Sequence, residues 1–369
     1  MKIAKAELFT LDLPFKVPFA VSYQTYYSMP TIIVKLTTED GTVGYGEATP
    51  DQHVTGETLE STTAVLQHTL LPSVLGFSPF DIESIHMHMN EQVKFVPAAK
   101  AAIDIACYDL MGKLSGQPVY NLLGGQYRKE IDIPYVISIG NADDTAAEAR
   151  KALHEGFHSL KLKTGPDLKQ SIESIRAVKE AAGSHIPLRV DANQGWGTVS
   201  NTFHVLRQIE GIDIDWIEQP VYADDMDALA EVKSRSSFSI MADEAIKDSK
   251  DLRLAIQKKA ADYINIKLMK CGGIYPAVKL AAQAEMEGLI CQIGSMVESS
   301  VGSAAGLHVT MAKANIQSCE LVGPLMLSDD IGNLSYKLPF AQLSEQPGLG
   351  IEVDIKKVHR LAANHIVIQ

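Results

Sequence analysis

Charged residues recur at the ends of five short, strand-like segments in the middle of the chain, at nearly constant spacing. These residues are Lys163, Asp191, Glu218, Asp243 and Lys267. Successive members lie 28, 27, 25 and 24 residues apart, so each interval holds a strand, a loop and a helix. A (β/α)₈ barrel of about 250 residues has a repeat of roughly 30, and its catalytic residues lie at the carboxyl ends of different strands. The spacing therefore predicts a barrel with a site at that end.

Two lysines alternate along the first of these strands, residues 159–164. Because successive side chains of a strand point to opposite faces, Lys161 and Lys163 share one face. The helical pattern that follows predicts a parallel sheet covered on both faces, so that face would be packed. An edge strand with two solvated lysines is the commoner explanation of an isolated pair. The carboxylates at the following strand ends favour a functional site instead.

Three carboxylates from successive strand ends, Asp191, Glu218 and Asp243, are hard oxygen ligands. Without a cation they would repel one another and raise each other's pKa. Mg²⁺ suits this donor set and keeps positions for water and substrate oxygens, and Mn²⁺ would also fit. The alternative is three unrelated polar caps of helix-entry loops. Asn193 and Glu244 are predicted to orient the ligands, with an ordinary surface charge as the alternative for Glu244.

The two outer lysines, Lys163 and Lys267, belong to the second and sixth strands, which lie across a barrel from each other. A lysine near a divalent cation and a second lysine has its pKa lowered from about 10.4 toward roughly 7–8, the range of a general base. One lysine would remove the proton α to a substrate carboxylate, and the other would return one to the opposite face. The metal would stabilise the enediolate, and Lys161 would lie beside the carboxylate as an electrophile. This chemistry predicts racemisation or epimerisation without a redox cofactor.

The flanking segments predict a second, α+β domain. Strands are expected at 2–14, 31–37 and 44–48, helices at 58–70, 81–89 and 98–113, and long loops at 17–29 and 49–57. The barrel is expected to begin with a strand at 131–139 and to end with strands at 289–293 and 317–321. We therefore expect a capping domain over residues 1–125, completed by the tail 330–369, and a catalytic barrel over residues 126–329.

Composition limits the kind of partner. The net charge is −12 without a basic block, which argues against nucleic acid. No apolar run approaches the length of a membrane span. The chain opens with an alternating strand rather than a signal peptide, and its four cysteines have no metal-binding spacing. We therefore expect a cytoplasmic protein that binds neither nucleic acid nor membrane. A small-molecule carboxylate substrate and a homo-oligomeric state are separate expectations.

The whole set of motifs resembles the muconate-lactonizing-enzyme subgroup of the enolase superfamily. The residues that carry the resemblance are Lys161-x-Lys163, Asp191-x-Asn193, Glu218, Asp243-Glu244 and Lys267, with Gly44-Tyr45-Gly46-Glu47 and Leu122-Leu123-Gly124-Gly125. The resemblance implies a (β/α)₇β modified TIM barrel with an N-terminal α+β capping domain, whose loops 17–29 and 49–57 close over the substrate. It leaves the substrate open, because the subgroup contains cycloisomerases, o-succinylbenzoate synthases, N-acylamino acid racemases and dipeptide epimerases.

Two further runs, 265–274 and 294–300, resemble N-succinylamino acid racemases and dipeptide epimerases most closely. Ala-Glu dipeptide epimerases carry an Asp-x-Asp pair on the eighth strand, where this chain reads Glu320-Leu321-Val322. The missing second acid argues against Ala-Glu specificity, although a glutamate there also resembles muconate cycloisomerases. The resemblance therefore favours an isomerase that racemises N-acyl (N-succinyl) amino acids. The alternatives are a dipeptide epimerase, then a muconate cycloisomerase or o-succinylbenzoate synthase.

Candidate substrate-binding residues come from the loops around the barrel mouth. They are Tyr26, Asp51, Ser295, Met296, Glu298 and Glu320. Asp51 either pairs with a cationic substrate side chain, such as Lys or Arg, or is a solvated loop carboxylate, which is the commoner case. Tyr26 lines the pocket or covers the barrel mouth. Glu298 contacts the N-acyl part of the substrate or caps the helix that follows it.

Overall fold

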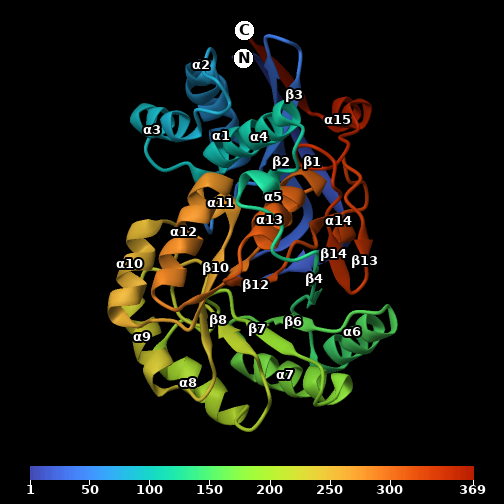
Figure 1. The fold of residues 1–369 in the computed structure, drawn as a ribbon. Coiled ribbons are helices and arrows are strands. Elements are labelled where there is room, and N and C mark those ends of the chain that lie inside the picture. The colour runs from blue at the N-terminus through green and yellow to red at the C-terminus, as the bar shows by residue number, and fades with distance from the viewer.

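Eight parallel strands, neighbours in space as in sequence, form the central sheet of the computed structural model, which describes residues 1–369. Its strands are β5 (Tyr135–Ile137), β6 (Leu160–Lys163), β7 (Leu188–Asp191), β8 (Trp216–Glu218), β9 (Ile240–Ala242), β10 (Tyr263–Ile266), β11 (Ile290–Ile293) and β12 (Ile316–Cys319). Helices connect each strand to the next and lie outside the sheet (Figure 1). Seven βα units and a final strand make this the predicted (β/α)₇β barrel.

Most barrel helices bury one face against these strands, whereas α13 is buried on almost every side. The barrel helices are α6 (Ala142–His154), α7 (Leu168–Ala182), α8 (Val199–Gln208), α9 (Met226–Arg235), α10 (Ser249–Lys258), α11 (Leu268–Cys271), α12 (Ile274–Met286) and α13 (Ser300–Ala312), with α14 (Gly323–Met326) after β12. In α7, the apolar residues Ile172, Ile175 and Val178 recur at helical spacing and are buried. Six of these helices, α6 to α10 and α13, start at side-chain N-caps after the strand-end loops, namely Asn141, Asp167, Thr198, Asp225, Asp248 and Ser299.

An antiparallel sheet and a helical layer cap one end of the barrel. The sheet has the order β15-β1-β2-β3, with β1 (Ile3–Ala20), β2 (Thr25–Thr38), β3 (Val43–Ala48) and β15 (Asn364–Ile368). The helices are α1 (Leu59–Val65), a π-helical turn η1 (Leu66–Leu70), α2 (Leu71–Val74), α3 (Ile82–Gln92), α4 (Pro97–Ser115) and α5 (Val119–Leu122). Helix α4 is buried over most of its length and packs on both β3 and α11. It therefore connects the capping sheet with the barrel.

The C-terminal end of the chain returns to the capping sheet. Strand β15 pairs antiparallel with β1, and α15 (Ile355–Leu361) packs on β1 as well. The two chain termini consequently lie at the same end of the molecule (Figure 1). The limits given above for the two domains stay a prediction.

The expected loop at 17–29 is largely absent, and this prediction was wrong. Strands β1 and β2 continue as a long hairpin, in which Ala20 pairs with Thr25 and only residues 21–24 form the turn. A register shift between Pro14 and Phe19 accommodates Pro14 and Pro18 within the strand. The second expected loop, residues 49–57, does lack helix and strand.

The expected first barrel strand at 131–139 is divided into two. Strand β4 (Glu130–Asp132) joins a small antiparallel sheet with β14 (Phe340–Gln342) and β13 (Tyr336–Lys337), whereas β5 enters the barrel. Pro134 lies between the two pieces and has no N–H group to continue one ladder of hydrogen bonds.

Among the helices, none combines the length and the apolar character that crossing a membrane requires. The four cysteines are free thiols.

A buried histidine in α13 yields a prediction about stability. His308 is fully buried, its Nδ1 accepts a hydrogen bond from the backbone N of Tyr120 at 3.1 Å, and burial lowers its pKa to about 4. Below pH ~6.5, His308 takes up a proton in the unfolded chain but stays neutral in the native chain. The free energy of unfolding therefore falls as the pH drops from about 6.5 to about 4. In His308→Gln, the pH slope of the unfolding free energy should shrink by up to one proton, about 1.4 kcal/mol per pH unit.

Chemical unfolding of both proteins at several pH values between 4 and 7 measures this slope. The exposed His204 supplies a matched control, because His204→Gln should leave the slope unchanged. Identical slopes in wild type and His308→Gln would contradict the assignment of the shift to His308.

Candidate active site

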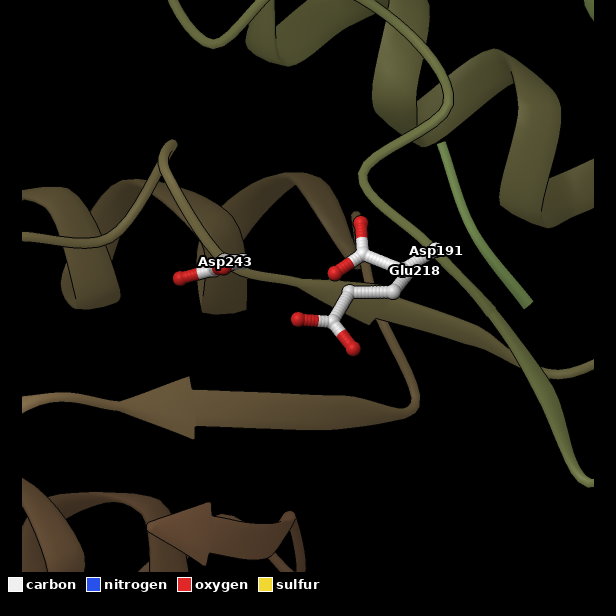
Figure 2. A group of neighbouring side chains, drawn as sticks. All are labelled: Asp191, Glu218 and Asp243. Atoms are coloured by element: carbon white, nitrogen blue, oxygen red, sulfur yellow. The ribbon is translucent and has the colours of Figure 1, made fainter. Parts of the chain in front are cut away.

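Three buried carboxylates meet at the carboxyl ends of neighbouring strands. Asp191 ends β7, Glu218 ends β8 and Asp243 directly follows β9, and all three are 0% exposed. One oxygen of each lies within 4.8 Å of the others, and Figure 2 shows the side chains of Asp191 and Glu218 directed toward the side on which Asp243 lies. Because parallel neighbours end at the same edge of a sheet, the predicted spacing brings these residues together. We call them the acidic triad.

The acidic triad fits a hard divalent cation. Burial and then the charge of Asp191 raise the pKa of Glu218 well above its usual range, which shows how unfavourable the crowded charges are. The buried Oδ2 of Asp243 has the ammonium group of Lys267 as its partner at 2.7 Å. Three buried carboxylates whose oxygens converge in this way form the donor set that Mg²⁺ or Mn²⁺ prefers.

The two lysines of β6 both reach the triad, as their shared face predicted. Lys161 Nζ lies 2.9 Å from Oδ2 of Asp191, 2.8 Å from Oε2 of Glu218 and 2.7 Å from Oε2 of Glu320. Lys163 Nζ lies 2.7 Å from the same Oδ2 of Asp191. Since β6 lies between β5 and β7 and Lys161 is 1% exposed, the edge-strand alternative is wrong.

Lys267 approaches the triad from the other end. It follows β10 and is mostly buried, and its Nζ pairs with Asp243, whereas Lys163 pairs with Asp191. Burial alone would lower the pKa of Lys267, but Asp243 and then Glu244 raise it by more, so the net shift is upward. The expected lowering assumes a bound divalent cation and stays a prediction. A lowered pKa would require the charge of these carboxylates to be offset.

Asn193 and Glu244 lie directly behind the triad. The backbone N of Asn193 donates to Oδ1 of Asp191 at 2.8 Å, and its side-chain Nδ2 donates to Oε1 of Glu244 at 3.1 Å. Its Oδ1 accepts a hydrogen bond from Lys163 at 3.0 Å. Glu244 is 2% exposed, and burial and then Asp243 raise its pKa to about 7, so the surface-charge alternative is wrong.

Three polar residues that the sequence interpretation did not single out also support the triad. Asn265 Nδ2 donates to Oε1 of Glu218 at 2.7 Å. Gln219 Oε1 accepts the backbone N–H of Asp243 at 3.0 Å, and Lys270 Nζ lies 2.5 Å from Oδ1 of the same aspartate. Asn265 was detectable in principle, because it precedes Lys267 by two residues along one strand end and therefore shares its face. Gln219 and Lys270 carry no such signal.

Two of the predicted substrate residues meet in the capping domain. Tyr26 Oη donates to Oδ2 of Asp51 at 2.6 Å, while Oδ1 of Asp51 accepts the backbone N–H groups of His53 and Val54 at 2.7 and 3.2 Å. Asp51 is therefore part of a built turn rather than a freely solvated carboxylate. Both residues border a cleft of about 510 Å³.

The turn of the β1–β2 hairpin connects this region with the triad. Ser22 Oγ donates to the backbone oxygen of Asn193 at 2.5 Å. The phenol of half-buried Tyr23 has its pKa raised by burial, then by Asp51 and, more weakly, by Glu244. Tyr23 therefore lies within electrostatic reach of both the capping loop and the triad, and the capping domain extends over the site.

The loop after β11 is held by one of its own carboxylates. Glu298 is buried, and it accepts hydrogen bonds from Ser295 Oγ and from the backbone N of Met296, the latter at 2.9 Å. The N-cap of α13 is Ser299, so the expectation that Glu298 caps this helix was wrong. Glu320 meets Lys161 at the triad. Contact of these residues with substrate stays a prediction.

Comparison with known families gives matches to both parts of the chain. Residues 5–124 match the N-terminal domain of mandelate racemase/muconate lactonizing enzyme, and residues 144–358 match the enolase C-terminal domain-like family. The N-succinyl-L-Arg/Lys racemase of Bacillus cereus is 50% identical over 369 residues, which cover 100% of both chains. Its crystal structure superimposes with a TM-score of 0.99.

A dipeptide epimerase is a second, more distant relative. The hydrophobic dipeptide epimerase of Enterococcus faecalis is 38% identical over 95% of this chain and 99% of its own length. Its structure in complex with Mg and the dipeptide L-Leu-L-Tyr has a TM-score of 0.92 and covers 95% of this chain and 100% of that one. By its two matched domains and its full-length relatives, the chain belongs to the mandelate racemase/muconate lactonizing enzyme family of the enolase superfamily.

Proposed function

We propose that the chain is an isomerase that racemises N-succinyl amino acids, with arginine and lysine as the preferred side chains. The observation that carries this proposal is the pair of lysines, Lys163 and Lys267, at opposite ends of a carboxylate triad. The 50% identity to an N-succinyl-L-Arg/Lys racemase over the full length supports the substrate class.

The acidic triad would hold one Mg²⁺, with Mn²⁺ as the alternative. Support comes from its buried oxygen donors and from the related epimerase structure that contains Mg. The bound cation would supply a Lewis acid for the charge that develops on the substrate carboxylate when the α-proton leaves. Asn193 and Glu244 would keep Asp191 and the neighbouring charges in place.

The two lysines would divide the proton transfer between them. One takes the α-proton from one face of the substrate carbon, and the other delivers a proton to the opposite face, so that the configuration inverts. In the reverse direction their roles exchange. Lys161, which pairs with Glu218 and Glu320, would offer its ammonium group to the substrate carboxylate. Ser295, Met296, Glu298 and Glu320 are proposed to line the remainder of the pocket.

Dipeptide epimerisation is the second candidate function, because relatives with that activity are 36–38% identical over most of the chain. Proton NMR in D₂O with Mg²⁺ distinguishes the two by following the α-proton of N-succinyl amino acids and of L,L-dipeptides. Exchange in the N-succinyl substrates supports the racemase. Exchange confined to the C-terminal residue of dipeptides makes the enzyme an epimerase. Exchange in neither panel overturns both and favours a cycloisomerase, for which a muconate cycloisomerase is a 30% identical relative.

Asp51 is proposed to select cationic substrates, and this gives a second prediction. Its Oδ2 accepts one hydrogen bond, from Tyr26, and so keeps a lone pair for a guanidinium or ammonium group. In Asp51→Asn, kcat/KM for N-succinyl-arginine should fall about 10–100-fold, as expected when a charge-assisted hydrogen bond of roughly 1.5–3 kcal/mol is lost. Activity toward a neutral substrate of similar length, such as N-succinyl-norleucine, should change little.

Steady-state kinetics on both substrates measure the effect as a ratio. Asp40→Asn is the matched control, because Asp40 caps a hairpin turn of the same domain through Thr38 and Thr42. Equal losses on the arginine and norleucine substrates would show that Asp51 only supports its turn.

A cytoplasmic location and a homo-oligomeric state stay predictions. Analytical ultracentrifugation would measure the oligomeric state.

A further inference from the structure

Lys270 is a buried cation that the proposed proton transfer does not use. It lies in the short helix α11, three residues after Lys267, and its side chain is 1% exposed. Its Nζ contacts Oδ1 of Asp243 at 2.5 Å, the backbone oxygen of Asp243, and the backbone oxygen of Asn265 at 3.0 Å. A lysine ammonium has three donors, and these contacts use all of them. Two of the three acceptors are backbone oxygens, so these contacts tie Lys270 to the ends of the barrel strands.

The contacts of Lys270 join the ends of two barrel strands. Asp243 follows β9, and Asn265 lies on β10. The side chain of Asn265 donates to Oε1 of Glu218 at 2.7 Å. Lys270 thus fixes Asp243 directly and Glu218 through Asn265. Because Lys270 occupies Oδ1 of Asp243, the other oxygen, Oδ2, faces Lys267.

We propose that Lys270 is a positioning residue of the metal site, which holds two of the three carboxylates in the geometry that a divalent cation needs. This inference rests on the proposed metal-dependent function. Groups that orient metal ligands in this way typically contribute 10–100-fold to metal affinity. The positioning role therefore predicts weaker metal binding when Lys270 loses its donors.

The alternative is that Lys270 only balances the negative charge of the buried carboxylates. The two roles predict opposite signs. A cation next to the triad repels a second cation, so removal of a charge-balancing lysine would strengthen Mg²⁺ binding. Removal of a positioning lysine weakens it, because Asp243 can then turn away from the other two ligands.

Calorimetric titration of Mg²⁺ into the full-length protein without substrate tests the sign. Lys270→Met keeps the length of the side chain and removes every donor, and Lys270→Gln removes the charge but keeps an amide donor. We expect Mg²⁺ to bind 10–100-fold more weakly to Lys270→Met, with Lys270→Gln between Lys270→Met and wild type. Lys100→Met is the matched control, since Lys100 is also buried but donates hydrogen bonds to Asn90 and Val93 in the capping domain. The Mg²⁺ affinity of Lys100→Met should stay within twofold of the wild-type value.

Unchanged or tighter binding in Lys270→Met would overturn the proposal, as would equal tightening in both variants. Circular dichroism and thermal unfolding without metal establish that each variant is folded. If Lys270→Met does not fold, Lys270→Gln decides by the same sign. Failure of the wild type to bind Mg²⁺ is a separate outcome, which overturns the proposed metal-dependent function and this inference with it.

Discussion

Replacement of either Lys163 or Lys267 by alanine is expected to abolish racemisation while leaving one-sided proton exchange. Each lysine meets the triad at a different end, one at Asp191 and one at Asp243, so each is expected to serve one face of the substrate carbon. A racemisation cycle needs both faces. Loss of a general acid or base typically lowers the rate by 10²–10⁴-fold. Polarimetry with N-succinyl-arginine should therefore show at least a hundred-fold loss in each variant.

Exchange of the α-proton in D₂O separates the two lysines. The lysine that remains can still remove a proton from the enantiomer that faces it and return a deuteron to the same side. The two variants should therefore exchange opposite enantiomers, whereas the wild type exchanges both. Lys169→Ala provides the control, because the side chain of Lys169 is 85% exposed on α7 and pairs with Glu173 rather than with the triad. A double-digit percentage of the wild-type racemisation rate in either variant would falsify the two-lysine assignment.

The charged residues of the site were predictable because their chemistry and their period agree. Asp191, Glu218 and Asp243 are expensive to bury, and they recur once per βα unit, so a shared edge of the barrel is the economical explanation. Strand alternation likewise placed Lys161 and Lys163 on one face, and the structure brings both to Asp191.

The supporting contacts of the site were not predictable from the same signals. Lys270 reaches Asp243 from a neighbouring strand unit, 27 residues away in sequence, and Gln219 reaches across from the end of β8. Such contacts depend on how adjacent strand ends are staggered, and one sequence does not contain that distance. The long β1–β2 hairpin was missed for a related reason. Pro14 and Pro18 are strand breakers on average, but a local register shift accommodates them here.

The pKa of Lys267 depends on which charges surround it. Asp243 and Glu244 lie close enough to outweigh the effect of burial and raise it, whereas the expected lowering counted a bound divalent cation and stays a prediction. The balance among these buried charges depends on ångström-scale distances. Residue type and strand order therefore predicted which residues meet at the site. The distances in the structure were needed to predict which of their charges dominates the pKa of Lys267.

Removal of the metal is expected to abolish activity as completely as loss of a lysine. Dialysis against EDTA should lower racemisation below detection, and Mg²⁺ should restore it. Glu218→Gln should prevent this restoration, because a neutral amide replaces the central carboxylate of the triad and binds a hard cation poorly. Mg²⁺ should also raise the thermal midpoint of the wild type, since a ligand at 100 times its Kd stabilises the native state by about 2.7 kcal/mol.

The metal-dependent thermal shift makes the test independent of activity. In Glu218→Gln the midpoint should no longer respond to millimolar Mg²⁺, whereas Glu231→Gln, a surface carboxylate paired with Arg235 on α9, should respond as the wild type does. An undiminished shift in Glu218→Gln would remove Glu218 from the set of ligands. Full activity after exhaustive EDTA treatment would contradict the proposed need for a metal. The lysines would then have to offset the charge of the buried carboxylates without a cation, and Lys161 already contacts three of these carboxylates.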